Sequence, residues 1–131
     1  MRLRLAAMAA FAGLVVAVLP VAAHHSGAAV FDNTKKIELT GVVTKVEWTN
    51  PHARFFMDVK DAAGNVVNWS LELASPNILV RNGWQRNSVK AGDTVTVTGS
   101  QARDGSKFGI ASTIVFPDGR RLNFLSAFDN K

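Results

Sequence analysis

The chain has 131 residues and a mass of 14.1 kDa, with no cysteine, no tyrosine and a formal net charge of +5. This length supports one domain, and the absence of cysteine excludes disulfides, thiolate metal sites, cysteine nucleophiles and lipid attachment through cysteine. Hydrophobic residues make up 47% and charged residues 19%, a balance that excludes a chain disordered throughout.

Residues 1–23 have the pattern of a signal peptide. Two arginines precede an uncharged run, Pro20 interrupts it, and Val21 and Ala23 are small residues of the kind found at cleavage sites. We predict cleavage after Ala23, a periplasmic or secreted protein, and no stable membrane span after processing. The alternative is a retained transmembrane anchor, because the apolar run reaches the lower limit for crossing a bilayer.

Cleavage changes the charge balance. The chain loses 23 residues and two arginines, which leaves 108 residues and a net charge of +3. That excess is spread along the chain, with no basic run longer than Lys35-Lys36 or Arg120-Arg121. A mild and scattered positive charge argues against nucleic acid as a partner.

Residues 24–36 show no sustained periodicity and are predicted to form an N-terminal arm, with the folded domain at 37–131. Residues 37–40 alternate apolar and polar side chains, Gly41 interrupts, and residues 42–48 continue on the other parity. A glycine where the face switches predicts a β-bulge that bends a long first strand. On this reading Val42, Thr44, Val46 and Trp48 share one face.

Two further strands follow as a hairpin. Asn50-Pro51 indicates a turn, after which residues 55–60 alternate with Phe55, Met57 and Val59 on one face. Residues 61–64 form a hairpin turn, and the third strand covers residues 67–73.

The alternation then stops for a short helix. Ser75 precedes a proline at the first helical position, and Gly83 is a stop signal about two turns later. A β-branched fourth strand at 94–98 and a fifth at 108–116 follow, with Asp104-Gly105 as the turn between them. A turn at 117–119 leads into a short tail.

The order of three strands, one short helix and two strands predicts an all-β fold. It resembles a small five-stranded OB-like barrel with the helix between strands three and four, over residues 37–116. A β-sandwich or an open meander with an incidental helix is the alternative. The predicted core consists of Val46, Phe55, Val59, Trp69, Leu71, Val95, Val97 and Ile110.

The three histidines are the candidate metal ligands. Cleavage after Ala23 makes His24 the N-terminal residue, so its α-amine and imidazole can chelate one metal ion, with His25 beside them. These groups titrate near about 7.7 and about 6.5, and such nitrogen ligands suit copper first, then nickel or zinc. This arrangement resembles the histidine brace of copper proteins. A solvated terminus that binds nothing is the alternative.

His52 lies in the loop between strands one and two, which rims the ligand face of OB barrels. An arm of 13 residues spans at most about 43 Å, so it can bring His24 or His25 to His52. We therefore predict a site of His24, His25 and His52 that binds copper, or zinc. The alternative for His52 is a hydrogen bond that caps its own turn.

The same loop supports a second hypothesis, an OB-type module that binds an envelope oligosaccharide, peptide or protein partner. Its predicted ligand-binding residues are Trp48, Asn50, His52 and Arg54. A third hypothesis is an accessory subunit of an envelope enzyme or transporter. The carboxylates of Asp32, Glu47, Asp58 and Glu72 have no partner that the sequence identifies.

No catalytic set stands out. None of the serines sits in a nucleophile elbow, no acid–histidine spacing indicates a triad, and there is no glycine-rich phosphate loop. Whether the protein is an enzyme stays open, and the small size with one candidate site favours a binding protein.

Several elements together resemble a family of small exported bacterial proteins of unknown function. They are His24-His25-Ser26, Phe31-Asp32, Gly41-Val42, Trp48-x-Asn50-Pro51-His52, Gly83-Trp84, Gly92-Asp93 and Asp118-Gly119. The resemblance covers nearly the whole chain after residue 23 and implies an exported single domain. It implies no activity, ligand or catalytic residue.

Overall fold

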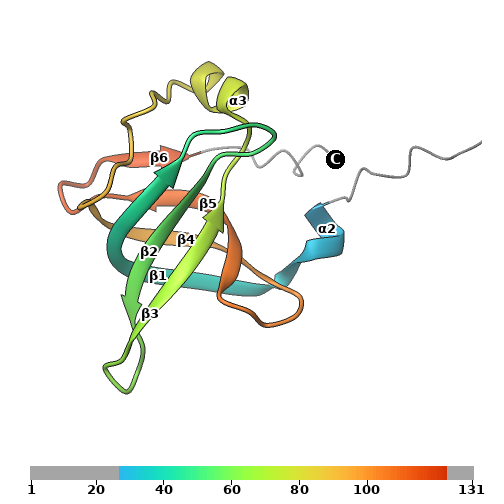
Figure 1. Ribbon diagram of the computed structural model, residues 1–131, viewed down its shortest axis with the longest axis vertical. Helices are drawn as coiled ribbons and strands as arrows, with labels where there is room; N and C mark the ends of the chain where they lie inside the picture. The colour runs from blue at the N-terminus through green and yellow to red at the C-terminus, as the bar shows by residue number, and fades with distance from the viewer. Residues whose placement is uncertain (1–26, 124–131) are drawn as a thin grey trace, which may run out of the picture.

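The computed structural model describes residues 27–123, so His24, His25 and the predicted cleavage point lie outside the described residues (Figure 1). Within them the elements are, in order, α2 (Gly27–Val30), β1 (Phe31–Glu47), β2 (Arg54–Lys60), β3 (Val66–Glu72), α3 (Pro76–Arg81), β4 (Thr94–Ala102), β5 (Phe108–Val115) and β6 (Arg121–Asn123). No helix in this part of the chain has the length and hydrophobicity needed to cross a membrane.

Five of the strands close into a ring. β1 pairs antiparallel with β2 and with β4, β2 pairs with β3, and β4 pairs with β5. A short parallel pairing of β3 with β5, at Ser70–Glu72 and Phe108–Ile110, joins the two ends. The predicted fold class, an all-β five-stranded OB-like barrel with a short helix between its third and fourth strands, is confirmed.

The first strand is longer than expected. It begins at Phe31 rather than Ile37, because Phe31 and Asp32 pair with Ala102 and Gln101 of β4. Residues 33–35 interrupt this ladder, which resumes at Lys36. That irregular stretch hides the alternation of a strand, so the sequence pattern alone read residues 31–36 as an arm.

Gly41 is needed for a different reason than the predicted bulge. It lies in register with Val59 on one side and Val95 on the other, and a Cβ there would overlap the carbonyl oxygen of Asp58. The register shift against β2 comes later, between Val43 and Lys45. The predicted bulge position is therefore wrong, and Val43 is buried in the core while its neighbour Val42 is exposed.

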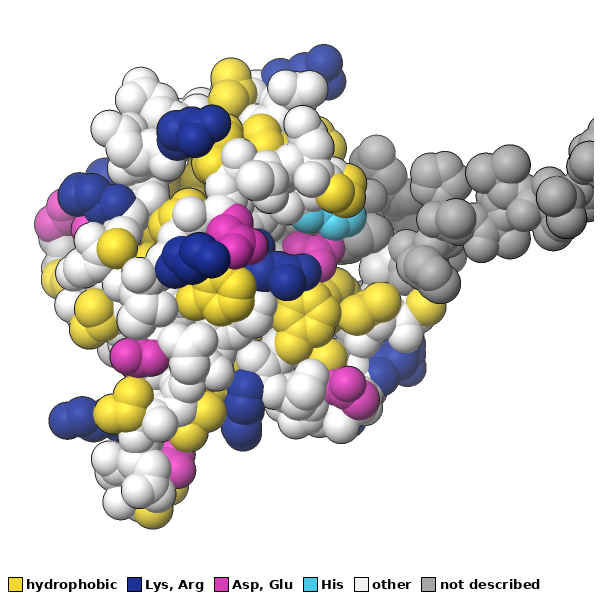
Figure 2. All heavy atoms as spheres, in the orientation of Figure 1, with side chains coloured by type: hydrophobic (Ala, Val, Ile, Leu, Met, Phe, Trp, Pro, Cys, Tyr) yellow, Lys and Arg dark blue, Asp and Glu magenta, His cyan; other side chains and the backbone are white. Residues whose placement is uncertain are grey.

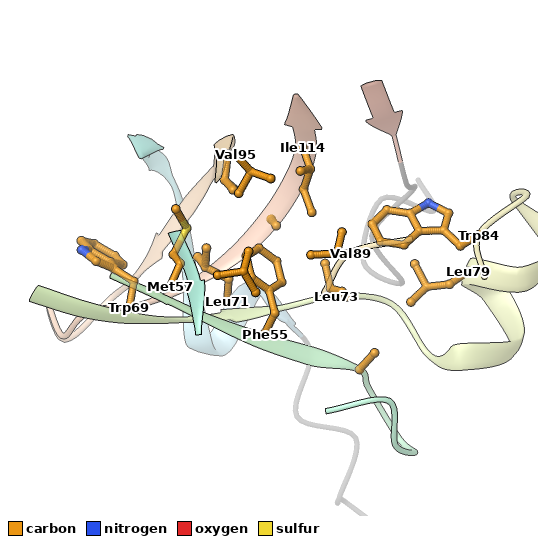
Figure 3. Packing of buried hydrophobic residues seen from close by; sticks show 14 of the residues in the cluster. Phe55, Met57, Trp69, Leu71, Leu73, Leu79, Trp84, Val89, Val95 and Ile114 are labelled. Atoms are coloured by element: carbon orange, nitrogen blue, oxygen red, sulfur yellow. The ribbon is translucent and has the colours of Figure 1, made fainter. Parts of the chain in front are cut away.

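The core confirms seven of the eight predicted residues as buried, while Val46 is only partly buried against the core. Side chains of β2 and β3 fill its centre, with Phe55 and Leu71 fully buried. Figure 3 shows Trp69 and Met57 toward one end of the barrel and Leu79 and Trp84 toward the other. Burying a large apolar side chain stabilises the fold by about 1.5–3 kcal/mol, so this core holds the barrel together.

Helix α3 closes the end where Leu79 and Trp84 lie. The Ser75 hydroxyl accepts a hydrogen bond from the Ile78 amide at 3.4 Å, as the sequence predicts for an N-cap, and Pro76 begins the helix. Gly83 follows the helix with a φ of 85°, a conformation that glycine tolerates best. The predicted capped helix is confirmed, and it covers one mouth of the barrel.

β6 extends the sheet beyond the expected five strands. The sequence pattern predicts only a tail after the turn at residues 117–119. In the structure Arg121–Asn123 pair with Thr113–Val115, beside the part of β5 that β3 does not reach. The tail thus satisfies backbone groups that the end of β5 would otherwise expose.

Candidate functional site

A buried carboxylate anchors the one histidine among the described residues. Oε1 of Glu72, at the end of β3, lies 2.7 Å from Nδ1 of His52 in the β1–β2 loop. The Glu72 side chain is 12% exposed and that of His52 is 30% exposed. Because an ionised carboxylate only accepts, this contact favours the proton on Nδ1 and makes Nε2 the nitrogen with a lone pair.

Local structure explains why the two residues meet. Ala53 forms two backbone hydrogen bonds with the residues that follow β3. Its amide donates to the Ala74 carbonyl, and its carbonyl accepts from the Leu73 amide. This extends the β2–β3 ladder past Arg54 and Glu72, which are in register, and brings the preceding His52 beside Glu72. The Asn50–Pro51 peptide in the same loop is cis.

Arg54 links this pair to the start of β1. Its guanidinium lies 3.7 Å from Oε2 of Glu72 and 5.1 Å from the centre of the Phe108 ring. The Phe108 ring is in turn 5.0 Å from the ring of Phe31, the first residue of β1. A continuous set of contacts therefore runs from the beginning of β1 across β5 and β2 to His52.

A second cation–aromatic contact lies on the same outer face. Lys45 lies 5.6 Å from the centre of the Phe56 ring and donates a hydrogen bond to Glu47 at 2.6 Å. That hydrogen bond holds the pKa of the Glu47 carboxyl below its ordinary value. Ser70 is in register with both Phe56 and Phe108, and its buried hydroxyl has no hydrogen-bond partner among residues 27–123.

Figure 2 shows this outer face, which we call the outer sheet face and define by Lys45, Arg54, Phe56, Ser70, Glu72 and Phe108. Basic side chains lie beside exposed hydrophobic ones there, and acidic and histidine side chains adjoin them. The face combines flat apolar surface with charges of both signs, which suits a ligand that has both apolar surface and polar or charged groups.

The structure brings together some of the predicted site residues and separates others. His52 and Arg54 both contact Glu72. Trp48 is partly buried and packs against the core, whereas Asn50 is exposed in the loop. The predicted ligands His24 and His25 lie outside the described residues, and within those residues no group of three or more histidine and acidic side chains is placed to hold a metal ion.

Glu72, which contacts both His52 and Arg54, is a residue that the sequence pattern did not assign to the site. Alternation along β3 assigns it to the outer face, where glutamate is ordinary. The hairpin carried only an approximate signal, because the predicted turn at residues 61–64 places Arg54 opposite Leu71, one residue short of its observed partner Glu72. His52, two residues before Arg54, then falls at the same end of the hairpin.

Comparison with known proteins gives a family but no function. The family of unknown function DUF6152 matches residues 10–112, which is more than three quarters of the chain. No curated protein matches the chain, and no solved structure does.

Proposed function

The chain belongs to DUF6152, a family of unknown function, and on the chemistry of its own residues we propose that it is an exported protein that binds copper, or zinc, as cargo. The ligands are the α-amine and imidazole of His24, the imidazole of His25 and Nε2 of His52. Export with cleavage after Ala23 is part of the proposal, because only cleavage provides that amine. The His-His-Ser and Trp-x-Asn-Pro-His elements are proposed as the marks of this site.

The observation that carries the proposal is the 2.7 Å contact between His52 Nδ1 and the Glu72 carboxylate. Histidines that bind metals usually donate their second ring N–H to a carboxylate or a carbonyl, which fixes the tautomer and raises the basicity of the ligating nitrogen. Glu72 is buried, so solvent competes little for the carboxylate oxygen that contacts the imidazole.

The reach of the chain supports a shared site. Contacts lead from Phe31 through Phe108, Arg54 and Glu72 to His52, and each step is 5.1 Å or shorter. From Phe31 back to His24 the chain can span about 16 Å, of which about 6 Å is the four-residue helix α2. The N-terminal histidines can therefore reach the edge of the barrel where His52 lies.

The test is a calorimetric titration of Cu²⁺ into protein processed after Ala23, at pH 7.5. We expect one site per chain, and nitrogen hyperfine structure in the electron paramagnetic resonance spectrum of the Cu²⁺ form. His52→Ala removes one ligand, and Glu72→Gln keeps all ligands but removes the carboxylate beside Nδ1. Loss of such a carboxylate lowers metal affinity by about 10–100-fold.

Glu47→Gln is the matched control, because Glu47 ends β1 just before the same loop, but its carboxylate accepts a hydrogen bond from Lys45 instead of contacting His52. It should leave the affinity unchanged. Protein that retains residues 1–23 should bind copper more weakly, since its His24 has no free α-amine. Processed protein that takes up neither copper nor zinc under these conditions would contradict the proposal.

The outer sheet face supports a second candidate function, binding of an envelope oligosaccharide or peptide. The observation that favours it is the pair of flat rings, Phe56 and Phe108, which have a cation 5.6 Å and 5.1 Å from their centres and Ser70 in register between them. Aromatic rings with nearby polar groups are the usual platform for sugars and peptides on a sheet.

The two functions are separated by one pair of variants. Phe56→Ala should weaken binding of cell-wall oligosaccharides or envelope peptides in a microarray or affinity assay and leave copper binding intact. His24→Ala should do the opposite. If Phe56→Ala retains every interaction that the wild-type protein shows, the outer sheet face is not the ligand site.

A further inference from the structure

A hollow opens at the end of the barrel opposite to α3. Its volume is about 350 Å³, at the small end of the range for small-molecule sites, and its apolar wall comes from Leu39, Val59, Val67 and Trp69. Figure 3 shows Trp69 at the end of the core away from Leu79 and Trp84. We call this hollow the barrel-mouth pocket.

The bend of β1 creates the barrel-mouth pocket. Pairing between β1 and β2 begins at Gly41 with Val59, so residues 38–40 of β1 pair with β4 alone. The β2–β3 hairpin continues past this point and projects away from β1 (Figure 1). The space between the diverging strands is left open, and partly buried apolar side chains such as Leu39 and Val67 line it.

Two lysines stand at the rim. Lys107 lies 5.2 Å from the centre of the Trp69 ring, and Lys60 follows Val59 at the start of the hairpin turn. Within residues 27–123 neither ammonium forms an ion pair. Each ammonium group thus lies beside an apolar wall, and no carboxylate of the described residues forms an ion pair with it.

The rim also has two carboxylates, and they differ in how they are engaged. Asp61 accepts hydrogen bonds from the Asn65 and Ala63 amides within its own turn, which lower the pKa of its carboxyl and hold the carboxylate toward that turn. Glu38 is exposed on β1, and its carboxylate forms no hydrogen bond or ion pair with the described residues. The rim therefore has two ammonium groups without an ion pair in the described part of the chain and two carboxylates, of which Asp61 is engaged by the amides of its own turn.

We propose that the barrel-mouth pocket binds a small amphipathic monoanion, an aromatic or short acyl group bearing a carboxylate or sulfonate. The apolar group lies against Leu39, Val67 and the edge of Trp69, and the acid group meets the Lys60 and Lys107 ammonium groups. This site shares no lining residue with the outer sheet face or with the His52–Glu72 pair, and it does not depend on metal binding.

The probe for the test is 8-anilinonaphthalene-1-sulfonate, an aromatic anion whose fluorescence rises in an apolar site. We expect saturable binding to the folded protein with a dissociation constant on the order of 10–100 µM. Lys107→Gln should weaken that binding by about tenfold, as expected for loss of a charged hydrogen-bond donor. Glu38→Gln should strengthen it, because the variant removes the carboxylate that repels the anion.

Lys45→Gln is the matched control, since Lys45 also lies over an aromatic ring but on the outer sheet face. It should leave the affinity unchanged, and circular dichroism should show that all three variants are folded. The absence of saturable binding, an equal loss in Lys45→Gln and Lys107→Gln, or tighter binding in Lys107→Gln would each overturn the proposal. Benzoate that displaces the probe from the wild-type protein would support it further.

Discussion

The contact between His52 and Glu72 makes a quantitative prediction about stability that is independent of any ligand. His52→Ala and Glu72→Ala each remove one partner, and the double variant removes both. Hydrogen bonds that involve a charged group contribute about 1.5–3 kcal/mol to the free energy of unfolding. The 2.7 Å distance and the burial of Glu72 favour a full contribution, whereas the 30% exposure of His52 reduces it. We expect a coupling free energy of about 1.5 kcal/mol between the two residues.

Arg54 provides the comparison within the same site. Its guanidinium is 3.7 Å from Glu72 and its side chain is 40% exposed, so solvent screens the pair. Exposed ion pairs of this kind contribute about 0.2–1 kcal/mol. The coupling of Glu72 with Arg54 should therefore be clearly smaller than its coupling with His52.

The assay is urea unfolding followed by tryptophan fluorescence at pH 7.5, with a chelator present so that no metal contributes. Two double-mutant cycles, His52 with Glu72 and Arg54 with Glu72, give the two coupling free energies. The slopes of the unfolding free energy against urea must agree among variants for the comparison to hold. A His52–Glu72 coupling below about 0.5 kcal/mol, or one smaller than the Arg54–Glu72 coupling, would refute the structural reasoning.

Three further predictions concern the barrel itself. Gly41→Ala should fail to fold or lose several kcal/mol of stability, because its Cβ would overlap the Asp58 carbonyl; an unfolding midpoint near that of the wild type would contradict this. Leu79→Ala should lower the free energy of unfolding by about 3 kcal/mol, measured in urea, because truncating this fully buried side chain of α3 leaves a cavity. Asp61→Asn should be less stable than the wild type at pH 7. The pKa of Asp61 is lowered chiefly by the hydrogen bond from the Asn65 backbone amide, so the ionised carboxylate stabilises the fold at pH values above its ordinary pKa of 3.8. That contribution is lost as the pH falls through the folded-state pKa. In thermal unfolding at pH 2–3 the wild type and Asp61→Asn should therefore have the same stability.

Much of the barrel can be predicted from the sequence because its signals are local. The alternation at Phe55, Met57 and Val59 identifies the buried face of β2, and Ser75-Pro76 identifies the start of α3. The turn at residues 61–64 forms as expected, with the Asp61 amide donating to the Asn65 carbonyl and Gly64 at a φ of 83°. Each of these depends on neighbours a few residues apart.

The site is less predictable, because its residues meet through strand register. Phe31, Arg54, Glu72 and Phe108 come from four different strands. Alternation along one strand shows which face a residue occupies but not which residue of another strand lies beside it. Trp48 illustrates the limit, since it belongs to the predicted ligand set but packs partly against the core.

The sequence by itself therefore determined the five barrel strands, the turns, the capped helix and the absence of thiolate ligands. Only the tertiary structure decided that β1 begins at Phe31, that β3 and β5 close the ring, and that Glu72 holds His52. The physical reason is distance along the chain. Hydrophobic periodicity and capping act within a few residues, whereas ring closure and the Glu72 contact join segments whose approach depends on the packing of the whole barrel.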